Sequence, residues 1–180
     1  MASFIIFWAK DRIENYLKNG DNGPLSVIFG GPHQSQPSFG KIKTGDKIFP
    51  ITVIDGKMYI LGFMEIEKYI SEEEYIKNYL DGIKNDMWDA YCVKNKKTIT
   101  HKIPWSCVDE VAIGKNGTKI IKRELPEKII NLIKLGPKKG EEMPLKIRDK
   151  KIQTSNLIGY FRRLSEESER IFIEIIENTN

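Results

Sequence analysis

The sequence predicts a mixed α+β domain in which strands cluster in the middle of the chain and helices lie early, between strands and at the end. Three observations support this prediction: an apolar, aromatic run at Ser3–Trp8, a hairpin signal at Asp55-Gly56, and helix-start signals at Ser71 and Ser165. The chain has 180 residues, of which 40% are hydrophobic and 30% are charged, as in soluble globular proteins. We expect residues 1–180 to form a single domain.

The first part of the chain predicts a buried strand followed by a short helix. Ser3–Trp8 is a continuous apolar run, which is typical of a strand covered on both faces. Asp11 and Glu14 have the spacing of a capping box, and Gly20 is expected to end the helix. The residues expected on the buried face of this helix are Ile13, Tyr16 and Leu17.

A long polar loop and a hairpin come next. Leu25–Phe29 has the composition of a short strand, and Gly30–Gly40 is a Gly-, Pro-, Gln- and Ser-rich segment that is too long for a tight turn. The next segments predict two strands, Lys47–Ile54 and Met58–Tyr69, joined by the dipeptide Asp55-Gly56, which favours a type I′ turn. Gly62 indicates a bulge or a close backbone approach within the second strand.

The second half alternates between helical and extended patterns. Ser71 and Glu74 form a capping box at the start of a helix, and Ile70 and Tyr75 can staple its entry. We expect a further helix from Leu125-Pro126 to Gly136-Pro137, and a last one that begins near Ser165 and buries Ile171, Phe172, Ile175 and Ile176. Three strands are expected between these helices, around Trp88–Val93, Thr98–Ile103 and Cys107–Ile113.

Composition excludes several classes of protein. The longest fully apolar run is Phe4–Ala9, whereas a membrane span needs about 20 residues. No signal-peptide pattern opens the chain, and the only cysteines are Cys92 and Cys107, so we expect a reducing, cytoplasmic setting and no membrane partner.

Charge points to an anionic partner. The net charge is only +4 at pH 7. However, positive charge is concentrated in the segment 94–123, where the only acidic residues are Asp109 and Glu110. The eight basic residues of this segment are Lys94, Lys96, Lys97, Lys102, Lys115, Lys119, Lys122 and Arg123. Such a local excess favours binding of an anion such as nucleic acid, and the alternative is a solvated, lysine-rich surface.

The motifs of cofactor and metal chemistry are absent from the sequence. There is no Gly-rich nucleotide-binding fingerprint, so no cofactor is expected. His33, His101, Cys92 and Cys107 match no common zinc spacing, and two histidines with two cysteines are weak evidence for a nucleophile pair. Adjacent Asp109 and Glu110 in a strand would face opposite ways and would not form an acid–base pair. We therefore expect neither a metal site nor a catalytic carboxylate pair.

Aromatic residues beside lysines suggest a pocket for a flat ligand. Trp8 ends the first strand and is followed by Lys10, while Trp105 and Ser106 follow Lys102. Tryptophan faces hold bases well, and stacking contributes about 1–3 kcal/mol per base. The alternative for each tryptophan is that it fills the hydrophobic core.

Three segments give the chain a resemblance to a known family. The first segment, with the hairpin that follows it, resembles the Lys-x-Gly-Asp pattern of PUA-like domains; its sequence is Gly40-Lys41-Ile42-Lys43-Thr44-Gly45-Asp46-Lys47-Ile48-Phe49. Among PUA-like domains it is most similar to the EVE domain, a relative of the YTH readers. Ile103–Val108 is similar to the proline-aromatic entry into a late barrel strand. Gly159–Glu167 resembles the closing segment that opens the final helix.

The resemblance implies a fold, a function and a set of site residues. The fold would be a small PUA-like β-barrel wrapped by several helices. The function would be non-enzymatic binding of DNA or RNA, with a flipped, methylated cytosine or adenine held in an aromatic-lined pocket. The pocket residues would be Trp8, Lys10, Ser35, Phe39, Trp105 and Ser106, with residues 35–39 as a lid. The phosphate-binding residues would be Lys94, Lys96, Lys97, Lys102, Lys115 and Lys119.

Two alternative functions stay open. The neighbouring ASCH branch of the same superfamily includes small enzymes that act on modified nucleosides, and Lys43, Thr44 and Glu65 are the nearest candidates for a Lys, Thr and Glu set. The third interpretation is a protein-binding module, such as an immunity or antitoxin protein, that uses its Trp and Tyr surface. Binding to oligonucleotides and turnover of nucleosides would distinguish the three.

Overall fold

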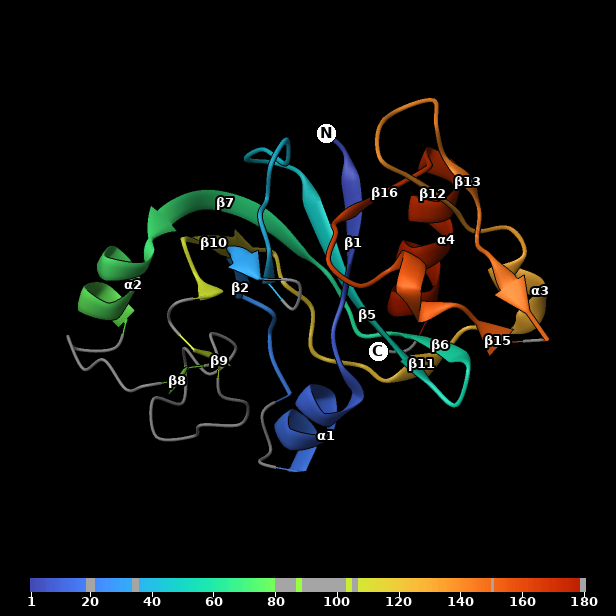
Figure 1. Ribbon diagram of the computed structural model, residues 1–180, viewed down its shortest axis with the longest axis horizontal. Helices are drawn as coiled ribbons and strands as arrows, with labels where there is room; N and C mark the ends of the chain where they lie inside the picture. Colours follow the sequence, from blue (N-terminus) through green and yellow to red (C-terminus); the bar gives the residue numbers. More distant parts are fainter. Residues whose placement is uncertain are drawn as a thin grey trace.

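The computed structural model describes residues 1–18, 22–33, 36–79, 87–88, 103–104, 107–149 and 151–178 (Figure 1). They form a mixed α+β structure, as the sequence predicts, and it is dominated by one ten-stranded sheet. Within these residues, no helix is both long and apolar enough to cross a membrane.

The main sheet has β1 and β5 at its centre. Its strand order is β13-β12-β16-β1-β5-β7-β10-β2, and β6 branches off by pairing with β5 and β11. Strands β1 and β5 are parallel, from Ser3 beside Lys47 to Phe7 beside Ile51. Among the described strands, β13 and β2 at the two ends of this order do not pair with each other, so the order is that of an open sheet. The strands are β1 (Ser3–Phe7), β2 (Val27–Gly30), β5 (Lys47–Ile54), β6 (Lys57–Ile60), β7 (Met64–Ser71), β10 (Glu110–Lys115), β11 (Arg123–Glu124), β12 (Lys134–Gly136), β13 (Met143–Pro144) and β16 (Arg162–Leu164).

Three two-stranded sheets lie beside the main sheet. They pair β3 (Pro32–His33) with β4 (Gln36–Pro37), β8 (Met87–Trp88) with β9 (Ile103–Pro104), and β14 (Ile147–Arg148) with β15 (Lys151–Ile152). The first of these occupies the segment that the sequence predicts as a long loop. The strands expected at 88–93 and 98–103 lie mostly outside the described residues.

The predicted hairpin is confirmed, with one correction. Asp55 and Gly56 both have positive φ, 52° and 82°, as a type I′ turn requires. The returning strand is not continuous to Tyr69 as predicted, because it breaks at residues 61–63 between β6 and β7. At this break Gly62 has a φ of +134°, and a Cβ atom there would collide with Thr118 Oγ1. The close backbone approach is the physical reason for this glycine.

Four α-helices are described: α1 (Lys10–Lys18), α2 (Glu72–Tyr79), α3 (Glu127–Ile130) and α4 (Glu166–Glu177). Ser71 Oγ accepts from the Glu74 amide at 3.1 Å, and Ser165 Oγ accepts from the Ser168 amide at 3.2 Å, so both predicted N-caps form. Helix α4 buries Phe172 and Ile176. On α1, however, Leu17 is 40% exposed and does not share the buried face of Ile13 and Tyr16.

The helix predicted from Leu125-Pro126 to Gly136 is wrong beyond its first turn. Helix α3 ends at Ile130, and residues 134–136 form β12, which pairs with β13 and β16. The pairing supplies backbone hydrogen bonds that the local sequence pattern does not reveal. Pro126 is the N-cap of α3 instead of its first helical residue.

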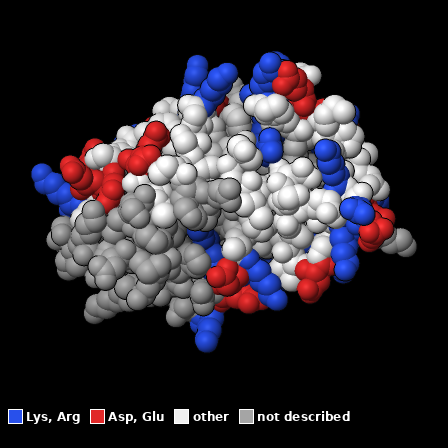
Figure 2. All heavy atoms as spheres, viewed as in Figure 1, with Lys and Arg blue, Asp and Glu red and all other residues white. Residues whose placement is uncertain are grey.

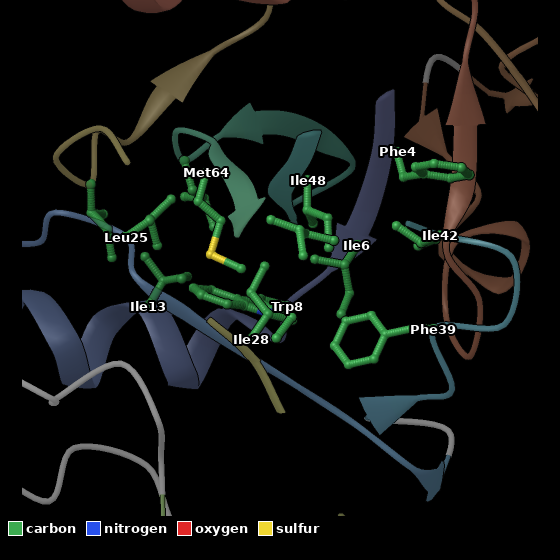
Figure 3. Packing of buried hydrophobic residues seen from close by; sticks show 14 of the residues in the cluster. Phe4, Ile6, Trp8, Ile13, Leu25, Ile28, Phe39, Ile42, Ile48 and Met64 are labelled. Carbon is green, nitrogen blue, oxygen red and sulfur yellow. The ribbon is translucent and has the colours of Figure 1, made fainter. Parts of the chain in front are cut away.

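Both faces of the central strands are buried. Along β1, Phe4 and Ile6 belong to one core cluster and Ile5 to another, because successive side chains of a strand point to opposite faces. Figure 3 shows the first cluster, in which Trp8 lies among Ile13, Ile28 and Met64. The second cluster lies between the sheet and α4 and includes Phe49 and Phe172, whose ring centroids are 5.6 Å apart. Burial on both faces explains why β1 is apolar from Phe4 to Phe7.

Candidate functional site: joined aromatic and basic grooves

A groove of about 420 Å³ opens where five separate segments of the chain meet. Phe4 comes from β1, Pro37 to Ile42 run from the end of β4 toward β5, and Gly159 to Phe161 precede β16. Gly31, Pro32 and Pro137 complete the lining. We call this the aromatic groove, and its aromatic lining residues are Phe4, Phe39, Tyr160 and Phe161.

Packing between aromatic rings holds one wall of the aromatic groove in place. Phe39 is 3% exposed and stacks on Phe161 with ring centroids 5.1 Å apart. Tyr69 packs edge-on against Phe39, also at 5.1 Å, and its hydroxyl donates to the Ile42 carbonyl at 3.0 Å. Burial raises the pKa of Tyr69, so its hydroxyl stays protonated as a hydrogen-bond donor. The groove therefore has a rigid, preorganised wall.

Tyr160 is the exposed ring of this groove. Its side chain is 59% exposed, although it lines the same groove as buried Phe39 and half-buried Phe161. The Arg162 guanidinium lies 4.7 Å from the Tyr160 ring centroid, and Arg162 Nε donates to the Asn156 carbonyl at 3.0 Å. A cation over the ring holds an exposed tyrosine in place. The arrangement offers a positioned, solvent-accessible aromatic face.

A second groove, of about 410 Å³, adjoins the first. The two share Phe4, Lys41 and Pro137. The basic side chains that line this second, basic groove are Lys41, Lys43, Lys138, Lys139 and Arg163. In Figure 2, Lys and Arg side chains gather at the upper edge, where Figure 1 shows the N-terminus and the loop between β12 and β13. An anion that enters the aromatic groove would therefore meet positive charge at once.

Asp46 is the acidic residue of the basic groove, and it is engaged by the backbone. It is 8% exposed, and its carboxylate accepts from the Ala2 amide at 2.7 Å and from the Lys43 amide at 2.9 Å. Asp46 thus closes the Lys43–Asp46 turn and ties it to the start of β1, as expected for an aspartate after a turn glycine.

Several basic side chains of the groove have glutamate neighbours. Lys138 Nζ lies 2.8 Å from Glu141, Lys139 Nζ lies 4.0 Å from Glu166, and Arg163 Nε lies 3.4 Å from Glu142. The lysine pairs are well exposed, and exposed ion pairs contribute only about 0–1 kcal/mol. Both lysines can therefore exchange a carboxylate for a phosphate at little cost in stability.

The structure places the predicted base-pocket residues in different environments. Trp8 is 3% exposed and lies in the core, where its ring meets Tyr16 edge-on at 5.8 Å and the Arg12 guanidinium at 5.3 Å. Phe39 does line the aromatic groove, whereas Lys10 is exposed at the start of α1, 3.6 Å from Glu14. Ser35, Trp105 and Ser106 lie outside the described residues.

The predicted phosphate-binding lysines line neither groove where they are described. Lys115 Nζ lies 3.3 Å from Glu65 Oε1, and Lys119 is exposed in the segment after β10. Lys94, Lys96, Lys97 and Lys102 lie outside the described residues. Among the described residues, no three His, Cys, Asp or Glu side chains are grouped to hold a metal ion.

The candidates for the ASCH-like enzyme divide between two neighbourhoods. Lys43 lines the basic groove and Thr44 is exposed beside it. The Glu65 carboxylate on β7 contacts Lys115 at 3.3 Å and Asn116 at 3.4 Å. The hydrogen bond from Lys115 is the main cause that lowers the pKa of Glu65, and the one from Asn116 adds to it. Such a carboxylate is stabilised as the anion, which suits an ion-pair partner better than a general acid.

Replacing Lys115 with methionine is expected to raise the pKa of Glu65 toward its ordinary value of 4.5, because the largest stabilising contact is lost. A carboxylate with a lowered pKa contributes stability above its unfolded-state pKa and loses it as the pH falls through the folded-state pKa. The variant should therefore lose less stability on acidification below about pH 4.5. NMR titration of the Glu65 carboxyl carbon measures this pKa shift. Lys68→Met, on the same strand, is the control. A Glu65 pKa that is the same in Lys115→Met and in the wild type would contradict the contact between Lys115 and Glu65.

No protein-family model matches this chain, and no curated protein matches it. The resemblance to the EVE domain therefore rests on the sequence segments that suggested it.

Proposed function

We propose that this protein binds nucleic acid, with one unstacked base against Tyr160 in the aromatic groove and the adjoining phosphates along the basic groove. The observation that carries this proposal is the junction of the grooves. The shared residues are Phe4, Lys41 and Pro137; the aromatic groove adds the exposed Tyr160 ring, and the basic groove adds four further basic side chains. A base needs a flat aromatic face and its phosphate needs a cation, and the chain offers both within one continuous surface.

The energetics of such a site are favourable. Stacking of a base on an exposed aromatic ring contributes about 1–3 kcal/mol. Tyr160 loses little conformational freedom on binding because Arg162 already lies over its ring at 4.7 Å. The exposed lysines add salt-dependent attraction to phosphates through counterion release.

The finer proposal is that the bound base is methylated, as in the PUA-like EVE and YTH proteins that the sequence resembles. Two positions support it. Pro37 to Phe39, from the segment expected to act as a lid, line the aromatic groove. Gly159 to Phe161, from the segment that resembles the family's closing motif, also line it. An added methyl group would find an apolar wall there.

Substitution of Tyr160 tests the proposal. Tyr160→Ala should weaken binding of a fluorescently labelled oligonucleotide by about ten- to a hundredfold, because the stacking face is lost. Tyr160→Phe keeps the ring and is the matched control, with near-normal affinity expected. Fluorescence anisotropy at fixed salt, on methylated and unmethylated oligonucleotides of the same sequence, measures both the stacking and the modification preference.

The possible results separate the proposal from its alternatives. Equal affinity of wild type and Tyr160→Ala would remove the aromatic groove as the base site. Absence of salt-sensitive binding to any oligonucleotide would contradict the proposed function and favour a protein partner. Turnover of modified nucleosides, with loss in Lys43→Ala, would favour the enzyme alternative instead.

A further inference from the structure

A third groove, of about 270 Å³, begins where the other two meet. All three are lined by Pro137, the first residue after β12. The third groove has an apolar side formed by Met143, Pro144 and Leu145, and Met143 is 67% exposed. Its polar lining residues are Glu141, Lys146, Asn156 and Arg162, and the Glu141 carboxylate pairs with Lys138 Nζ at 2.8 Å. We call it the methionine groove.

Tyr160 and Arg162 form a ridge between the aromatic groove and the methionine groove. Tyr160 lines the first, Arg162 lines the second, and the guanidinium lies 4.7 Å from the ring centroid. The hydrogen bond from Arg162 Nε to the Asn156 carbonyl fixes the ridge from the side of the methionine groove. The ridge therefore carries a positive charge between two hollows that both have apolar walls.

This arrangement matches two consecutive nucleotides. A base in the methionine groove would contact the thioether of Met143, a favourable partner for an aromatic ring, and could hydrogen-bond to Asn156. The phosphate that links it to the base on Tyr160 would cross the ridge beside Arg162, whose guanidinium suits a phosphate. Each groove alone is an ordinary surface groove. Because the ridge with its positive charge lies between them, the two grooves together can accommodate one base, then a phosphate, then a second base.

We infer that the ligand is a single strand of nucleic acid, bound with two adjacent bases on either side of the Tyr160–Arg162 ridge. This inference rests on the proposed function and adds its substrate class. Extruding a base from a duplex costs free energy, and two adjacent bases approximately double that cost. A single strand offers bases that are already unpaired, so a site for two bases favours it over a duplex.

Substitution of Met143 tests the second base position. Met143→Ala should weaken binding of a single-stranded hexanucleotide by about two- to tenfold, because the contact between sulfur and the base is lost. Leu132→Ala is the matched control, since Leu132 is an exposed aliphatic residue, 47% exposed, in the turn after α3 and outside all three grooves. The same hexanucleotide annealed to its complement should bind at least tenfold more weakly than the single strand.

Abasic oligonucleotides decide whether the two bases bind together. With a single intact base, Tyr160→Ala should still weaken binding, whereas the effect of Met143→Ala should disappear. With two adjacent intact bases, both effects should be present. Equal affinity for single strand and duplex, or a Met143→Ala variant that binds the two-base strand like Leu132→Ala, would overturn the inference while leaving the base on Tyr160 intact. Loss of the Tyr160→Ala effect on every strand would instead contradict the proposed function.

Discussion

Replacing Trp8 with alanine is expected to lower the free energy of unfolding by about 3–5 kcal/mol and to leave the nucleic-acid affinity of the folded protein unchanged. Trp8 is 3% exposed within a cluster that includes Ile6, Ile13 and Ile28 (Figure 3). Its removal would leave a cavity between β1 and α1 and would remove the edge-on contact with Tyr16 at 5.8 Å. Urea unfolding followed by circular dichroism measures the first effect, and anisotropy measures the second.

Tyr160→Ala is the reciprocal control for this experiment. Tyr160 is 59% exposed, and surface substitutions usually change stability by no more than about 0.5 kcal/mol. The two variants should therefore show opposite profiles: Trp8→Ala is less stable and binds normally, and Tyr160→Ala is stable and binds weakly. A Trp8→Ala variant with wild-type stability and reduced affinity would return Trp8 to the base pocket that the sequence predicts.

The elements that the sequence predicts well are those with strong local signals. The hairpin of β5 and β6 has a turn that needs positive φ at both Asp55 and Gly56, and the caps at Ser71 and Ser165 each bond to a nearby amide. These features depend on residues within a few positions of one another. Helix starts and tight turns can therefore be predicted from a single chain.

The strands of the last third depend on distant partners and escape such prediction. Strands β11 to β16 have only two or three residues each, and β13 and β14 are exposed. So short a segment shows no alternation of polar and apolar residues. The 134–136 segment illustrates the consequence: its local pattern continues a helix, but pairing with β16 makes it a strand.

The same reasoning explains why the sequence does not reveal the basic groove. A count along the chain finds the lysines of 94–123, because they lie close together in sequence. The basic groove instead collects Lys41 and Lys43 from one loop, Lys138 and Lys139 from another, and Arg163 from β16. Only the sheet order, with β16 between β12 and β1, brings them together. The sequence did contain one indication of the grooves: the segments around Lys41 and Gly159, which resemble PUA-like domains, contribute lining residues.

Neutralising the lysines of the basic groove is expected to reduce salt-dependent binding strongly. Each phosphate contact to a single strand contributes about 0.7 to the slope of log affinity against log salt. Replacing Lys41, Lys43, Lys138 and Lys139 together with glutamine should therefore lower the magnitude of that slope by roughly three. Stability should change little, because the ion pairs of Lys138 with Glu141 and of Lys139 with Glu166 are exposed. Anisotropy titrations of one single-stranded oligonucleotide over a range of salt concentrations give the slope.

A second set of lysines provides the decisive comparison. The sequence predicts that Lys96, Lys97 and Lys102 contact phosphates, so that replacing all three with glutamine should lower the slope for duplex DNA by roughly two to three. If phosphates bind along the basic groove, replacing the first set must lower the salt slope for a single strand strongly, whether or not replacing the second set also lowers it. If the second set lowers the slope and the first leaves it unchanged, the phosphates run along the 94–102 segment, and the basic groove has no part in binding. A reduced slope with the first set, and a wild-type slope with Lys68→Gln and Lys77→Gln as exposed controls, would place the phosphates along the basic groove.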